Sequence, residues 1–232
     1  MTASAHLQRS EGYFGLHTDF HASALDRDVW GDLTEEMVER VLRDLSPDFV
    51  QVDCKGHFGY ASYSTQVGYA APGLTKDGLR IWRDVTRRHG VALVVHYSAL
   101  WDAAAVKHHP EWAVTHADGS RDDMALSLFS PYLDELMIPQ LKEVISMYDV
   151  DAAWVDADSW GTTLDYSESA LAALRNATGI TEPPRSTDDP NWEILFQLVC
   201  YQFRIHATKY MDALHEFRPG FQVACNWVQS PG

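Results

Sequence analysis

Short apolar segments alternate along the chain with longer segments in which apolar residues recur every three or four positions. The short segments are rich in aliphatic and aromatic residues, and each ends in polar or aromatic ones, which is typical of buried parallel strands. The longer segments are typical of amphipathic helices. We predict five strands at Tyr13–His21, Phe49–His57, Val91–Leu100, Ala152–Trp160 and Phe221–Val228.

The segments between the predicted strands carry signals for helix starts and turns. Asp32 is followed three residues later by Glu35, a spacing that resembles a capping box. In a later helix Pro139 should produce a kink or mark the true first turn. The longest helix should begin where Asp189 can cap it and Pro190 can occupy its first turn. The stretch 115–121 looks like a small hairpin inserted after the third strand.

Strands that alternate with helices predict an α/β fold with a parallel sheet. We expect a (β/α)8 barrel of the TIM type. Five β/α steps do not close such a barrel, because eight strands are needed before every edge is paired. Residues 1–232 are therefore expected to form a single, partial barrel domain, truncated after about five β/α units. A doubly wound open sheet of five strands is the alternative fold.

Composition and charge narrow the choice of partners. Acidic residues number 33 against 18 basic ones, and the formal net charge of -15 would repel a phosphate backbone, so we expect no nucleic acid. No stretch approaches the roughly 20 apolar residues of a membrane helix, and the first residues lack a secretory signal. A cytoplasmic protein without a membrane partner is expected, and homo-oligomerisation is left open. The three cysteines lack the spacing of a disulfide framework or a zinc site.

Polar residues gather where the predicted strands end, which in a barrel is the edge that faces the active site. Asp156 follows a strongly apolar run, where a carboxylate is costly unless something uses it. Alternation along a strand predicts that Asp156 and Asp158 lie on one side, and likewise His17, Asp19 and His21.

A carboxylate with aromatic neighbours suits sugar hydrolysis. One ionised carboxylate attacks or stabilises the anomeric carbon, while a second acid protonates the leaving oxygen. Aromatic side chains offer flat apolar surfaces on which the C–H face of a sugar can stack, and candidates here are Tyr97, Trp154, Trp160 and Trp227. The sequence therefore predicts a glycoside hydrolase whose chemistry depends on Asp156.

Three motifs follow one another in an informative order. They are CKGHFGYASY (54–63), HYSALWD (96–102), and the segment 130–158, which ends in a Trp-x-Asp step and Asp158. Together they resemble the α-L-fucosidase families of retaining glycoside hydrolases, over roughly residues 13 to 160. One family strand reads roughly K-H-H-D-G-F, and here His57 matches its second histidine while Gly56 replaces the first. The HTDFH run and Asp158 indicate a divergent branch.

The resemblance implies a two-step retaining displacement in which Asp156 is the nucleophile and forms a glycosyl ester. It also implies that His17 or His21, His57, His96 and Trp154 line the sugar pocket. Strand-end position adds further candidate substrate-binding residues: Asp19, Tyr97, Asp158, Trp160, Asn226 and Trp227. The general acid/base, usually a glutamate in these families, is not identified, and a fragment without it would not complete hydrolysis.

Two alternatives remain open. A metal-dependent hydrolase could use His17, Asp19 and His21, which alternate along one strand, as zinc ligands together with His57, His96 or Asp156. Sugar hydroxyls need the same donors and acceptors without any metal, so we expect a carbohydrate substrate, no metal and no cofactor. The other alternative is a noncatalytic or incomplete sugar-binding barrel.

Overall fold

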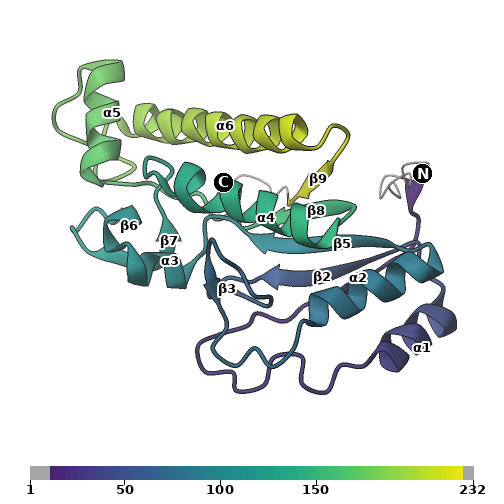
Figure 1. The fold of residues 1–232 in the computed structure, drawn as a ribbon. Helices are drawn as coiled ribbons and strands as arrows, with labels where there is room; N and C mark the ends of the chain where they lie inside the picture. The colour runs from purple at the N-terminus through teal and green to yellow at the C-terminus, as the bar shows by residue number, and fades with distance from the viewer. Residues whose placement is uncertain (1–10, 227–232) are drawn as a thin grey trace.

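A computed structural model describes residues 11–226 of the chain. Its core is a sheet in which five parallel strands lie side by side in chain order, and all five predicted strands are confirmed (Figure 1). Most end a few residues earlier than predicted, which leaves their last polar residues in loops. The strands are β1 (Gly15–Thr18), β2 (Phe49–Lys55), β5 (Ala92–Ser98), β8 (Ala152–Asp156) and β9 (Gln222–Cys225).

The long helices form one layer on one face of this sheet. They are α1 (Glu35–Leu45), α2 (Gly78–His89), α4 (Ile138–Tyr148) and α6 (Trp192–Phe217). Helix α1 packs against α2, α2 against α4 and α4 against α6, a succession that Figure 1 shows from the lower right to the top. The fold is therefore mixed α/β with a mostly parallel sheet. Within residues 11–226 the sheet is open, because β1 pairs only with β2 and β9 only with β8.

Shorter elements follow the carboxyl ends of the strands. Strands β6 (Ala113–Thr115) and β7 (Arg121–Leu126) form the predicted antiparallel hairpin after β5. The others are β3 (Tyr60–Ala61), β4 (Tyr69–Ala70), α3 (Ala103–His108), η2 (Pro110–Trp112) and α5 (Glu168–Thr178). None of the helices in the described part of the chain is long and apolar enough to cross a membrane.

Two predicted helix caps are wrong by a few residues. Helix α1 is capped by Thr34 and not by Asp32, because Thr34 has extended backbone angles and its side chain accepts a hydrogen bond from the N–H of Met37. Helix α6 begins two residues later than predicted. Asp189 instead forms a turn by accepting from the N–H of Asn191, which precedes the helix.

Pro139 lies in the first turn of α4, but the helix itself begins earlier, so Pro139 does not mark its true first turn. The preceding residues, η3 (Leu133–Met137), form a wider π-helical turn. Proline has no N–H to donate to the carbonyl four residues earlier, and a widened turn before it accommodates that missing bond. Helix therefore continues without a break from η3 into α4.

A buried ion pair joins the end of β2 to the start of α3. The ammonium of Lys55 lies 2.6 Å from Asp102 Oδ2, and both side chains are 0% exposed. Tyr132 also accepts from Lys55, at 3.1 Å, and the ammonium lies 4.3 Å from the centre of the Tyr97 ring. Asp102 in turn accepts from the N–H of Ala105 and so caps α3. This pair fixes two loops that border the candidate site.

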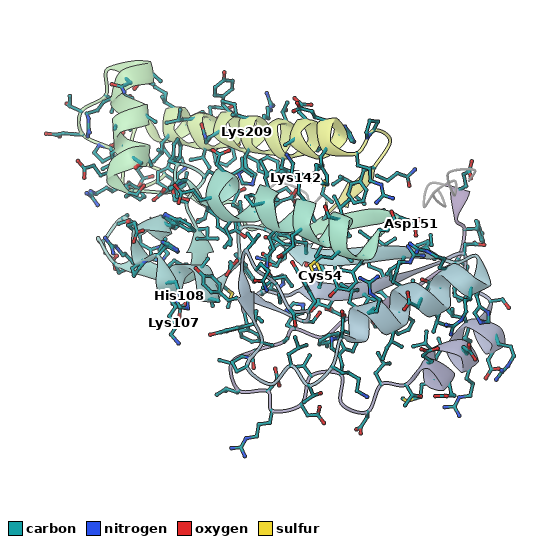
Figure 2. The ribbon with its side chains drawn as sticks, in the orientation of Figure 1. Cys54, Lys107, His108, Lys142, Asp151 and Lys209 are labelled. Atoms are coloured by element: carbon teal, nitrogen blue, oxygen red, sulfur yellow. The ribbon has the colours of Figure 1, made fainter. Side chains whose placement is uncertain are left out.

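Replacing Lys55 by methionine should lower the free energy of unfolding by about 3–5 kcal/mol, because the Asp102 carboxylate would remain buried without its partner. Urea denaturation measures this change. Lys107→Met is the matched control, since Lys107 points away from α3 into solvent (Figure 2), and it should change stability little. Equal effects of the two substitutions would contradict the role assigned to the buried pair.

Candidate active site

The face of the sheet opposite the helix layer, called here the inner face, carries the polar side chains. Val52, Val95 and Val155 point toward the helices and are buried in the core. Strand alternation therefore turns their neighbours to the inner face. Across the parallel register Asp53 pairs with His96, His96 with Trp154, and Ser98 with Asp156. These residues come from three adjacent strands and meet near their carboxyl ends.

Asp156 is the last residue of β8, and its two oxygens have different surroundings. Oδ1 accepts hydrogen bonds from the Ala157 N–H at 2.8 Å, from Trp160 Nε1 at 2.9 Å and from Asn226 Nδ2 at 2.7 Å. Oδ2 lies 3.3 Å from His96 Nε2 and 3.7 Å from His57 Nε2. One oxygen is thus held firmly, while the other faces two imidazole rings.

These contacts keep the Asp156 carboxyl ionised. Burial alone would raise its pKa, but the hydrogen bonds from His96, Trp160 and the Ala157 backbone outweigh burial and lower the pKa to about 2. An ionised carboxylate in a buried, hydrogen-bonded setting is the form that can attack an electrophilic carbon.

His96 lies between two carboxylates and is completely buried. Its Nδ1 contacts Asp53 and its Nε2 contacts Asp156. Burial would lower the pKa of His96, but the hydrogen bonds and charges of Asp156 and Asp53 outweigh it and raise the pKa to about 9. A protonated His96 donates from both nitrogens and so ties β2, β5 and β8 together.

His57 has the opposite protonation state. Burial, and next the neighbouring His21, lower the pKa of His57 to about 4, so the ring is neutral. The Ser98 hydroxyl donates to the Trp101 carbonyl at 2.7 Å and therefore accepts from His57 Nδ1, 2.6 Å away. Nε2 of His57 is then the unprotonated nitrogen, a hydrogen-bond acceptor that points toward Asp156.

Aromatic rings surround the two histidines. Trp154 lies 4.8 Å from the ring of His96 and 5.1 Å from that of His17, and its Nε1 donates to the Asn226 side chain at 2.9 Å. Trp101 and Trp160 pack edge to face with centroids 4.5 Å apart, and His57 contacts both rings. The carboxylate of Asp156 therefore lies among rings that can contact an apolar ligand face.

Several residues of the predicted site lie elsewhere. Tyr97 points to the helix side, where its hydroxyl donates to Gln140 at 2.9 Å, because strand neighbours such as His96 and Tyr97 face opposite ways. Asp158 does not share a side with Asp156, since the positive φ of Ala157, 52°, ends the strand. Its carboxylate accepts from Tyr210 of α6 at 3.0 Å. Trp227 lies outside the described residues.

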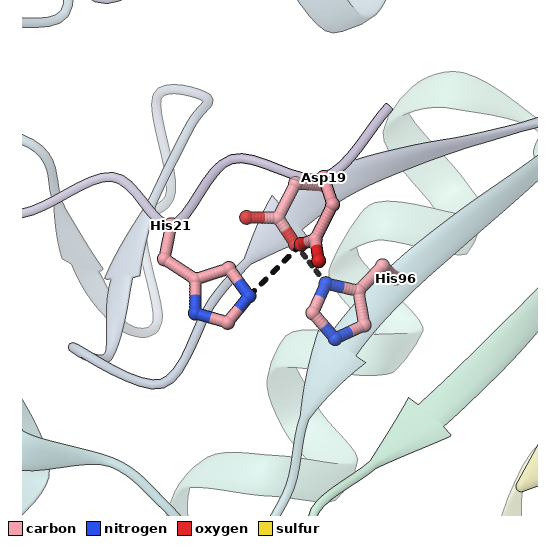
Figure 3. Close-up of side chains that lie close together, drawn as sticks. Asp19, His21 and His96 are labelled. Carbon is pink, nitrogen blue, oxygen red and sulfur yellow. Dashed lines mark hydrogen bonds and ion pairs between the residues drawn. The ribbon is translucent and has the colours of Figure 1, made fainter. Parts of the chain in front are cut away.

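Asp19 and His21 follow the end of β1 and lie beside the inner face. Asp19, His21, Asp53 and His96 each offer one ligand atom, and these four atoms lie within 4.8 Å of one another. Figure 3 shows the side chains of Asp19, His21 and His96 close together. His17 is not among them, which changes the metal-ligand set expected from the sequence. His21 Nδ1 accepts from the His57 N–H at 3.4 Å, so Nε2 carries the proton and donates to Asp19 at 2.9 Å. A cation would have to displace that proton.

Three contributors to the site were absent from the predicted binding residues: Asp53, Ser98 and Trp101. Asp53 and Ser98 lie at strand ends on the inner face, so alternation alone would have found them. Trp101 lies in a loop, and only its contacts in the folded chain identify it. Of the predicted residues, His17, His21, His57, His96, Trp154, Asp156, Trp160 and Asn226 come together.

Solved structures with a similar fold include sugar-cleaving enzymes. An α-L-fucosidase isoenzyme 2 from Paenibacillus thiaminolyticus matches 92% of this chain with a TM-score of 0.78 and 22% identity. A beta-galactosidase from the psychrophilic Marinomonas ef1 matches 91% with a TM-score of 0.64 and 16% identity. A hypothetical protein from Ruminiclostridium thermocellum matches 91% of this chain and 96% of its own, with a TM-score of 0.54 and 13% identity.

These likenesses show that the fold is that of α-L-fucosidases over part of their length. The chain spans 32% of the Paenibacillus fucosidase and 36% of the Marinomonas galactosidase. No family model matches the sequence, and no curated protein matches it either.

The raised pKa of His96 predicts how stability depends on pH. The pKa of His96 is about 9 in the folded protein and 6.5 ordinarily. Protonated His96 therefore stabilises the fold fully below pH 6.5, and this stabilisation is lost as the pH rises through 9. The wild-type free energy of unfolding should therefore fall over that range, and His96→Gln should flatten the fall. Urea titrations across the range test this, with the exposed His89→Gln as control. An unchanged slope in His96→Gln would refute the charged state of His96.

Proposed function

We propose that the chain is part of a retaining glycoside hydrolase of the α-L-fucosidase type and that Asp156 is its nucleophile. One observation carries the proposal: the Asp156 carboxylate is held ionised at the carboxyl end of a parallel sheet, among histidines and tryptophans. The similar fold of fucosidases supports the same assignment for the sugar class.

In this mechanism Asp156 Oδ2 attacks the anomeric carbon. The bond from that carbon to the leaving oxygen breaks, the leaving oxygen takes a proton from a general acid, and a glycosyl ester forms on Asp156. Oδ2 suits this role because Oδ1 is already occupied by three donors. Water then gives up a proton to the conjugate base of that acid and attacks the anomeric carbon, whose bond to Asp156 breaks, so that the free sugar and the carboxylate are released. This chemistry needs no cofactor.

The histidines and aromatic residues bind the sugar. The unprotonated Nε2 of His57 accepts a hydrogen bond from a sugar hydroxyl, and the 3.7 Å that separates it from Asp156 Oδ2 keeps both atoms close to the same ring. His17 and Trp154 contact the sugar from the inner face, and Trp160 from the loop after β8. Asn226 fixes both Trp154 and Asp156 and acts through them.

In this proposal the five strands are consecutive strands of a (β/α)8 barrel, within one partial domain. Two features favour a barrel over a doubly wound sheet. The strands follow chain order without the reversal that a doubly wound sheet has, and the long helices cover one face instead of two. The general acid/base is not assigned to any residue described here.

Asp156→Gly should lower turnover by at least about a thousandfold, because the covalent step loses its nucleophile. The substrate should be an α-L-fucoside with a leaving group that departs without protonation, such as the fluoride, so that the measurement does not depend on the general acid. Azide should restore part of the turnover by attacking in place of the carboxylate and should yield the fucosyl azide of inverted configuration.

Asp158→Asn is the matched control, two positions along the chain. Its carboxylate faces Tyr210 instead of the inner face, so turnover should remain within a few-fold of wild type. Full activity of Asp156→Gly, or an equal loss in both variants, would refute Asp156 as the nucleophile.

A further inference from the structure

A cavity lies beside the candidate site, in the loop that joins β1 to α1. Its volume is about 290 Å³, and it is lined by Phe20, His21, Asp26, Asp28, Val29 and Trp30. The loop leaves the carboxyl end of β1, which is the edge of the sheet where Asp156 ends β8. The cavity and the candidate site therefore open at the same end of the sheet.

His21 lines this cavity and also contacts the candidate site. Its ring centre lies 4.3 Å from that of His57, and His57 Nε2 lies 3.7 Å from Asp156 Oδ2. The cavity is thus separated from the nucleophile by two side chains in contact. A ligand bound at Asp156 and extended past His57 and His21 would enter it.

The lining combines aromatic rings with carboxylates. Phe20 and Trp30 pack edge to face with ring centres 4.4 Å apart. Asp26 accepts from the Ser23 N–H through Oδ2, and Asp28 accepts from the Thr75 hydroxyl through Oδ1. Within the described part of the chain the other oxygen of each has no hydrogen-bond partner. The described lining residues include no lysine or arginine, so the cavity suits a neutral ligand with hydroxyl groups and not an anion.

Trp30 is held in a backbone conformation that bulky residues rarely adopt, with a φ of 75°. Its indole N–H donates to the Ser62 carbonyl at 2.7 Å. The ring also lies directly on Gly78, where an added Cβ would come within 2.2 Å of it. Contacts with two other segments thus fix the ring in place, and backbone strain of this kind concentrates where a side chain is used.

We infer that this cavity binds the sugar unit on the leaving-group side of the glycosidic bond, with Trp30 as its aromatic contact and Asp26 and Asp28 as acceptors of its hydroxyls. The inference rests on the proposed function, because it needs the first sugar ring to lie at Asp156. It names the substrate class as a glycoside of at least two sugar units.

The test follows the protein's tryptophans separately during sugar binding. The full 232-residue chain is labelled with 5-fluorotryptophan, and its eight tryptophan signals are assigned by single Trp→Phe variants in fluorine NMR. The chain is then titrated with L-fucose and with a disaccharide of α-L-fucose linked to N-acetylglucosamine. Trp154 and Trp160 should shift with both sugars, and Trp30 with the disaccharide alone.

The outcomes separate the two proposals. Shifts of Trp154 and Trp160 without any shift of Trp30 would overturn the leaving-group cavity and leave the proposed function standing. A Trp30 shift with the disaccharide alone, without shifts at Trp154 and Trp160, would support sugar binding in the cavity and count against the proposed function. No shift with either sugar would overturn both.

Substitutions at the carboxylates of the cavity, with Trp30 itself unchanged, give a second measurement. The double variant Asp26→Asn and Asp28→Asn should weaken disaccharide binding about fivefold and leave the affinity for L-fucose unchanged. Leu25→Ala is the control, since Leu25 belongs to the same loop, does not line the cavity and is 88% exposed. Equal weakening for both sugars, or none, would overturn the inference.

Discussion

The proton on His96 is the interaction on which the inner face depends. The two flanking carboxylates favour the charged form of this buried imidazole, and its charge offsets those of Asp53 on β2 and Asp156 on β8 together. Without that charge two buried carboxylates would lie on either side of β5 with no cation between them. The same contact helps to keep Asp156 ionised, so one interaction holds the three strands together and maintains the charge that a nucleophilic carboxylate needs.

The two faces of the sheet have different roles. Aliphatic side chains on the helix side bury most of the core, and the Lys55–Asp102 pair holds the loops that leave β2 and β5. The inner face has few aliphatic residues near the carboxyl end, and polar side chains satisfy one another there instead. Because rigid strands position His96, Trp154 and Asp156, loops such as that of Trp30 can vary without moving the central residues.

Periodicity and composition predicted the strands well, because parallel strands buried on both faces are continuous apolar runs. Asp156 could be predicted for the same reason, as a carboxylate at the end of such a run. Residue type and nearness to a strand end did not place Tyr97 and Asp158 correctly. Tyr97 lies on the helix side of the sheet, and the left-handed backbone of Ala157 turns Asp158 away from the inner face. Trp101 and Trp30 are placed by contacts with segments far apart in the sequence, and local sequence patterns do not predict such contacts.

The left-handed backbone at Ala157 has a consequence for how such chains diversify. A β-branched side chain at this position would clash with its own backbone, whereas glycine or asparagine would be tolerated. The position after the strand-end carboxylate is therefore restricted to a few small or amide residues, whatever ligand the surrounding loops select. We therefore expect glycine, alanine or asparagine to follow the strand-end aspartate in distant homologues that keep this turn.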